Sequence, residues 1–303
     1  LRGRLKPGRI LLAASEPMKG LVVLTTVQSE GSPFWSGRPR PSDPQITNFI
    51  RGALKLPDRY AAGGRERRLK FFLPYLGHPN RVLSDSAYVE FADAPYSIVA
   101  RFAPAVGLSK LRTWLKDPKT PEEHRSLYLV MLGQIGKTQD LPWIEAQVLA
   151  AARSKPPATL GALLICYLNL KGSGGLNLLE KAFLKGGLER RNAALETMRT
   201  LMDETTAVPK SKVLPLFRNL LSDPDLAGSV LRDLALWEDW AALPQVLPLL
   251  ELPAKQMFIR IAAIRYLRSC PLPQAQEKLE QLRQQDPKAA ESWPQPFVKS
   301  RKR

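Results

Sequence analysis

Apolar residues recur every three or four positions along most of the chain, and the pattern is clearest between residues 81 and 136. One stripe of a helix in this stretch is formed by Leu127, Val130, Met131 and Ile135. A capping sequence, Thr-Pro-Glu-Glu at 120–123, precedes the stripe, and a glycine follows it. The pattern therefore predicts an amphipathic helix between Thr120 and Gly136, in which Thr120 caps the first turn.

The same arrangement repeats toward the C-terminus. The run Val213-Leu214-Pro215-Leu216 recurs 33 residues later as Val246-Leu247-Pro248-Leu249, and a similar run from Leu176 precedes it by 37 residues. A period of this length predicts stacked helical hairpins, none of which can bury its apolar face alone. We therefore expect an all-α fold, an α-solenoid. The second helices of the three hairpins are expected at 188–203, 225–236 and 255–269.

The pairs 175–203, 211–236 and 243–269 resemble HEAT repeats of the armadillo-type superfamily, with an apolar first helix, an Asp-Pro type of turn and a basic, Ala-rich second helix. The stretch Asp85–Ala92 (DSAYVEFA), with the segments after it around Trp114 and Leu127, is similar to an uncharacterised bacterial family of HEAT-like proteins. That family carries a short β segment before its repeats. The resemblance implies a solenoid of HEAT-like hairpins, and it implies no activity and no catalytic residue.

The two ends of the chain lack the helical period. Two aliphatic runs bounded by turn residues, Ile10–Ala14 and Leu21–Val27, predict strands, and residues 31–44 predict a Pro/Gly loop. The Pro-rich, basic segment from Trp293 onward predicts disorder. The expected organisation is a small β segment and Pro/Gly loop over 1–42, a HEAT-like solenoid over 43–290 and a disordered basic tail over 291–303.

The net charge of +17 invites a nucleic-acid interpretation, but the distribution of the charge weakens it. Residues 1–80 hold 14 Lys and Arg against 5 Asp and Glu, the body 81–298 holds 27 against 23, and the last five residues add four cations. A groove built for a duplex would concentrate its cations on the repeats. We therefore expect weak, non-specific polyanion binding through the termini.

The sequence leaves two alternatives open for the cellular location of the protein. The longest nearly apolar run, 158–170, is shorter than the roughly 20 residues that a membrane-spanning helix needs, so no transmembrane segment and a soluble chain are expected. The chain begins at Leu1 and carries no apolar signal segment. It is exported if a signal peptide was removed before Leu1, and cytoplasmic otherwise.

Polar and aromatic residues gather around a predicted helix that runs from Val82 through Phe91, where Tyr88, Glu90 and Tyr96 are candidates for an interaction surface. Asp85 and Glu90 are five residues apart, about 140° around a helix, so they do not form an acid pair on one face. Capping, pairing with arginine and exposure to water are the simpler roles for these carboxylates. Trp114, in a short predicted helix, is a further interaction candidate.

The cluster Trp237, Asp239 and Trp240 allows two interpretations. Some HEAT-like DNA glycosylases hold a damaged nucleotide with tryptophans and an aspartate. This chain is similar to them in its expected architecture and contains residues of these types, but the residues do not stand at the positions of that family's pattern. Packing between repeats is the simpler role for the two indoles. Cys166 and Cys270 lie in apolar contexts as small hydrophobic residues, and no metal-ligand spacing is present.

These observations favour a non-catalytic helical-repeat scaffold, or protein-interaction module, whose concave face holds another protein. No catalytic residue, cofactor or metal ligand is predicted, although the question of an enzyme stays open. The alternatives are a nucleic-acid-binding HEAT-like protein of the DNA-lesion glycosylase type and a helical-repeat lyase. A basic concave face would favour nucleic acid, and a deep pocket joining Trp237 or Trp240 to a carboxylate would favour an enzyme.

Overall fold

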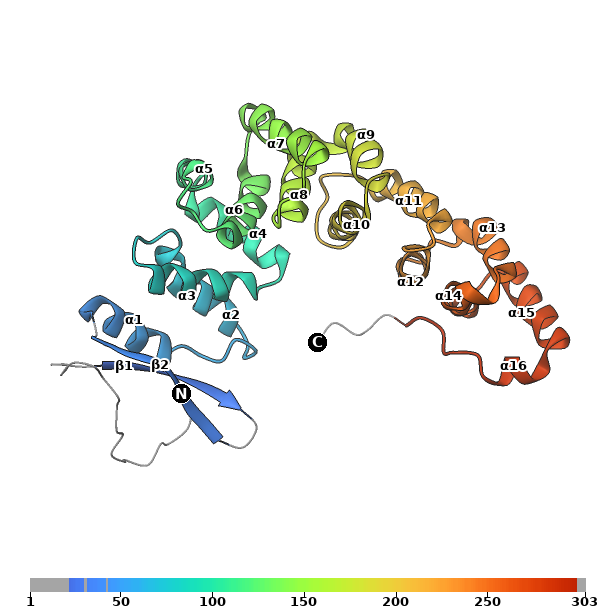
Figure 1. The fold of residues 1–303 in the computed structure, drawn as a ribbon, viewed down its shortest axis with the longest axis horizontal. Helices are drawn as coiled ribbons and strands as arrows, with labels where there is room; N and C mark the ends of the chain where they lie inside the picture. The colour runs from blue at the N-terminus through green and yellow to red at the C-terminus, as the bar shows by residue number, and fades with distance from the viewer. Residues whose placement is uncertain (1–21, 30–31, 42, 299–303) are drawn as a thin grey trace. The chain divides into compact units, whose positions relative to one another are not determined.

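The computed structural model describes residues 22–29, 32–41 and 43–298, and Figure 1 shows the order of the elements. The chain divides into two compact units, Leu1–Val99 and Ala100–Arg303. The two units are described in turn.

The first unit contains a two-stranded antiparallel sheet. Strand β1 (Val22–Ser29) pairs with β2 (Ser32–Pro41), in a register that sets Ser29 opposite Ser32 and Val22 opposite Pro41. Strand β2 therefore occupies most of the stretch in which a Pro/Gly loop was expected. Prolines are compatible with it because each strand of a two-stranded sheet has an unpaired edge, where no backbone N–H is needed. The predicted strand Ile10–Ala14 lies outside the described residues.

Helices α1 (Pro44–Leu54), α2 (Gly64–Phe72) and α3 (Arg81–Ala92) follow in the first unit, with a 3-10 turn at Leu73–Tyr75 after α2. The start of α1 is fixed by Asp43, whose side chain accepts from the backbone N–H of Gln45 at 2.8 Å. The ring of Phe49 packs edge-on against those of Phe72 and Tyr75. Behind these rings the unit buries Leu69, Leu83, Ala87 and Phe91 completely.

Helix α4 (Tyr96–Val106) spans the boundary between the units. The second unit continues with a series of helices joined by short turns. They are α5 (Leu108–Lys116), α6 (Glu122–Ile135), α7 (Leu141–Arg153), α8 (Leu160–Lys171), α9 (Leu176–Leu178) with a π-helical extension (Leu179–Leu184), α10 (Leu188–Asp203), α11 (Lys210–Asn219), α12 (Ala227–Leu236), α13 (Leu243–Val246) with a 3-10 extension (Leu247–Glu251), α14 (Met257–Ser269), α15 (Pro273–Gln285) and α16 (Pro287–Glu291). Residues 43–298 thus form helices and turns, which confirms the predicted all-α class.

Neighbouring helices of the second unit pack in pairs, such as α5 with α6, α7 with α8 and α11 with α12 (Figure 1). The second helices of successive pairs also pack on one another, as α6 does on α8 and α12 on α14. In the stripe predicted for α6, Leu127 and Met131 are buried, while Val130 and Ile135 are half-buried. Leu164 and Phe217 are also almost fully buried. Within the described residues, no helix is long and apolar enough to cross a membrane.

Polar contacts in the second unit join residues at several separations along the chain. Some are shorter than a helical pair, such as Arg112 with Asp140, 28 residues apart, and Arg218 with Asp239, 21 apart. Others join partners that lie 32 to 36 residues apart, about one helical pair. The contacts at this longer separation are Glu122 with Ala158, Asn169 with Thr205, Arg191 with Asp223, Arg199 with Asp233, and Asp203 with Trp237.

The segment Trp293–Val298 lies on helix α14, so the prediction of disorder from Trp293 is wrong for these six residues. Nη1 of Arg268 donates to the backbone carbonyls of Trp293 and Pro294 at 2.9 and 2.8 Å. The N–H of Phe297 donates to Oγ of Ser269 at 3.0 Å. Composition alone suggested a solvated tail, whereas arginine side chains on a neighbouring helix satisfy its carbonyls.

Candidate functional site

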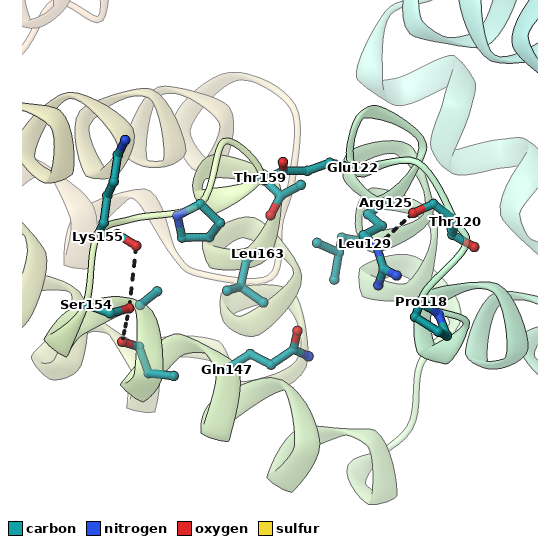
Figure 2. Close-up of a pocket in the computed structure, with 13 residues that line it drawn as sticks. Pro118, Thr120, Glu122, Arg125, Leu129, Gln147, Ser154, Lys155, Thr159 and Leu163 are labelled. Carbon is teal, nitrogen blue, oxygen red and sulfur yellow. Dashed lines mark hydrogen bonds between the residues drawn. The ribbon is translucent and has the colours of Figure 1, made fainter.

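An open groove of about 550 Å³ lies in the second unit, between α6, α7 and α8. The loop before α6, the last two turns of α7 and the loop between α7 and α8 form its rim (Figure 2). Its walls combine small side chains, such as Ala150 and Ala151, with the leucines Leu129 and Leu163. The groove is open to solvent and is not a closed cavity.

Arg125 supplies the positive charge of one wall. Its Nε donates to the carbonyl of Thr120 at 3.2 Å and its Nη1 to that of Leu115 at 2.6 Å, while Nη2 bonds the carbonyl of Asp117. These acceptors lie at and just beyond the C-terminus of α5, where helix carbonyls have no intrahelical partners and attract a cation. All three acceptors are neutral carbonyls, so none of these bonds offsets the positive charge of the guanidinium beside the groove.

Glu122 and Gln147 are two further polar residues that line the groove. Oε1 of Glu122 accepts from the backbone N–H of Ala158 at 3.2 Å, which ties the start of α6 to the loop before α8. Gln147 reaches from α7 into the space between α6 and α8 (Figure 2), and its buried Nε2 has no hydrogen-bond partner in the part of the chain that the structure describes. A buried donor without an acceptor costs about 1–3 kcal/mol.

The ionisable side chains that line the groove are Glu122, Arg125 and Lys155. Among its lining residues, Glu122 is the only carboxylate, and there is no His or Cys. Over residues 43–298, no three His, Cys, Asp or Glu side chains come close enough together to hold a metal ion.

Glu90 is a buried partner of an arginine and not a free group for binding. It is 6% exposed, and its Oε1 and Oε2 accept from Nε and Nη2 of Arg68 at 2.5 and 2.6 Å. The hydrogen bond and charge of Glu90 raise the pKa of Arg68. Tyr88, on α3, and Tyr96, at the start of α4, are half-buried. Glu90 therefore pairs with an arginine, which is one of the simpler roles expected from the sequence.

Trp114 packs inside its helical pair. Its ring lies 4.8 Å from that of Tyr128 on α6, and its carbonyl accepts from Oγ1 of Thr120 at 2.7 Å. Thr120 therefore does not cap α6 as predicted. Pro121 takes the cap position without any side-chain bond. The hydroxyl of Thr120 instead satisfies a carbonyl near the C-terminus of α5.

The cluster at 237–240 is held together by internal contacts. Nε1 of Trp237 donates to Asp203 at 2.9 Å, and its ring stands edge-on to Phe217 with 4.7 Å between centroids. Asp239 is 7% exposed and accepts two hydrogen bonds from Arg218, at 2.7 and 2.6 Å. The ring of Trp240 packs on Tyr266 at 5.5 Å. The packing interpretation describes all three residues, and Asp239 offers no free carboxylate to a ligand.

A further ion pair, between Arg112 and Asp140, was not anticipated from the sequence. Nε and Nη2 of Arg112 donate to the two carboxylate oxygens at 2.7 and 2.9 Å, and the N–H of Lys137 adds a third bond at 2.8 Å. Burial alone would raise the pKa of Asp140, but the bonds from Arg112 and Lys137 outweigh it and hold the pKa below its usual value. The two residues are 28 apart in the chain, so no local pattern indicates the contact.

Comparison with protein-family models, with curated proteins and with solved structures finds no match to this chain.

Proposed function

We propose that the chain is a non-catalytic α-solenoid of HEAT-like hairpins that binds an extended segment of a partner protein in the groove between α6, α7 and α8. The observation that carries this proposal is the buried, unpartnered Nε2 of Gln147 beside an open groove. Rotation of the amide toward a carbonyl oxygen of a bound segment gives this donor an acceptor and removes its cost.

The recurring separation of 32 to 36 residues between bonded partners supports the solenoid. Stacked repeats contact only their neighbours, so contacts at one repeat length are expected to dominate. The β1–β2 hairpin precedes the repeats in sequence, and we assign it as the small β segment of the HEAT-like arrangement. These assignments rest on spacing and packing within the described residues.

The chemistry of the groove supports a peptide as its occupant. Polypeptide backbone presents carbonyl oxygens at regular intervals, and Gln147 and Arg125 both carry donors that suit carbonyls. The small side chains of Ala150 and Ala151 leave room for a backbone to approach the helix. Lys155 and Arg125 outnumber Glu122 among the charged lining residues, so an acidic segment is favoured over a basic one.

The glycosylase alternative has no comparable support. That chemistry needs a carboxylate facing a base-binding pocket. Asp239 is instead saturated by Arg218, and Trp237 and Trp240 are in contact with other rings.

The test is selection of a random peptide library on the full chain, followed by hydrogen exchange of the protein with and without each enriched peptide. We expect enriched peptides to slow amide exchange at the start of α6, the end of α7 and the start of α8. A library that yields no binder, or binders that protect only other helices, would refute the proposed site.

A further inference from the structure

Helix α14 exposes apolar side chains over its first two turns. Phe258 is 85% exposed, Met257 45% and Ile261 36%. Ile259, Tyr266 and Leu267 of the same helix are buried. Three exposed apolar groups within five residues form a patch of the kind that marks an interaction site.

The last two turns of α14 already hold an extended segment of the chain itself. Nε of Arg265 donates to the carbonyl of Gln295 at 2.9 Å, and its guanidinium lies 4.1 Å from the ring centroid of Phe297. Arg268 and Ser269 bond the backbone of the same segment. Most of these contacts are made to backbone atoms, so this helix is equipped to receive extended polypeptide.

The apolar patch and the segment share one face of the helix. Phe258, Ile261, Arg265 and Arg268 follow each other at intervals of three and four residues, which aligns them along one side. The segment Trp293–Val298 covers the C-terminal half of this face and leaves the N-terminal half open. A second segment that lies on Phe258 and Ile261 would therefore continue an interface that is already formed.

The charge beside the patch is positive. The guanidinium groups of Arg265 and Arg268 donate to neutral carbonyls, so neither charge is neutralised by those bonds. The positive charges of Arg265 and Arg268 favour a partner that carries carboxylates and repel a basic one.

We infer that the exposed face of α14 binds an extended acidic segment of a partner protein, with an aromatic or aliphatic side chain seated on Phe258 and Ile261. The site is separate from the groove at α6–α8 and rests on the proposed function only in that both assign a protein partner. Aromatic anchors supply most of the affinity at such sites, and the surrounding charges set the preference between partners.

The test uses the full chain and a fluorescein-labelled nonapeptide with four Asp or Glu, one central Phe and two Leu, measured by fluorescence anisotropy. We expect this peptide to bind, and a matched peptide with Lys in place of each acid to bind at least about tenfold more weakly. The double variant Phe258→Ser and Ile261→Ser should weaken the acidic peptide by about tenfold or more, the usual loss for a central anchor. The control is Leu188→Ser on α10, a side chain that is 50% exposed and lies on another helix.

Equal binding of the acidic peptide to the double variant and to the wild type would overturn the inference, as would equal binding of the two peptides. Self-association that light scattering detects in the wild type and not in the double variant would also overturn it, by assigning the face to a second copy. If the acidic peptide does not bind the wild-type chain, while library peptides still protect the groove at α6–α8, this inference fails and the proposed function stands.

Discussion

Arg218 and Asp239 form a bidentate ion pair between α11 and the turn before α13, with Nε to Oδ2 at 2.7 Å and Nη2 to Oδ1 at 2.6 Å. The backbone carbonyl of Asp239 also accepts from the hydroxyl of Tyr266 on α14 at 2.7 Å. Asp239 therefore joins α11, the turn before α13 and α14. This makes Asp239 a structural residue.

Replacement of Asp239 by Ala should destabilise the chain by about 1–3 kcal/mol, because it leaves the Arg218 guanidinium without its acceptor. Urea unfolding followed by circular dichroism measures the change. Glu277→Gln, an exposed position on α15, is the control and should change stability by less than about 0.5 kcal/mol. An Asp239→Ala variant as stable as the control would show that the pair contributes nothing.

Two isoleucines on α14 provide a matched comparison of burial. Ile259 is 6% exposed and Ile261 36%. Ile259→Ala should cost about 2–5 kcal/mol, the range for large-to-small changes in a core, and Ile261→Ala clearly less. The unfolding midpoints of the two variants measure the stability that each substitution removes. Equal losses would contradict the assigned packing face of α14.

The acid sensitivity of the chain should depend in part on Asp140. Its pKa is lowered in the folded chain, so the unfolded chain takes up a proton at a higher pH than the folded one. The stability that this carboxylate contributes is thus present above about pH 3.9 and is lost as the pH falls through the folded pKa. Asp140→Asn should flatten the fall of melting temperature between about pH 5 and pH 3, and a profile parallel to the wild type would contradict the assignment.

Binding to polyanions should be weak and carried by the ends of the chain. Replacing Lys299, Arg301, Lys302 and Arg303 by Ser should lower the affinity for random DNA at low salt. The slope of log affinity against log salt concentration should become shallower by up to about 0.9 for each phosphate that is no longer neutralised. The matched control replaces four exposed lysines of the second unit, Lys181, Lys185, Lys210 and Lys212, and should have a smaller effect. A larger effect of the control would locate the nucleic-acid surface on the second unit.

Helix positions could be read from the sequence because their signals are local. The stripe from Leu127 to Ile135 and the glycine after it predict a helix that ends where α6 ends. The buried position of Val213 and of Val246, 33 residues later, agrees with the alignment of the two runs. The period of three and four residues needs no knowledge of distant partners.

The partners of charged residues could not be read in the same way. The guanidinium that meets Glu90 comes from Arg68, 22 residues earlier, and the one that meets Asp239 comes from Arg218. These contacts depend on how one helix pair stacks on the next, which the spacing of charges does not encode. The groove at α6–α8 could not be predicted for the same reason. It forms only when α6, α7 and α8 pack together, and none of the three helices is unusual in sequence.

The central claim, that the groove between α6, α7 and α8 holds a partner segment, is tested most directly by filling that groove. Ala150→Trp places an indole in it from α7, and Ala146→Trp places the same indole on an exposed position of the same helix outside it. The measurement is the Kd of library-selected peptides for both variants and the wild type, by isothermal titration calorimetry. The account predicts at least about a tenfold loss of affinity for Ala150→Trp and wild-type affinity for Ala146→Trp. Wild-type affinity in both variants, with both folded by circular dichroism, would contradict it.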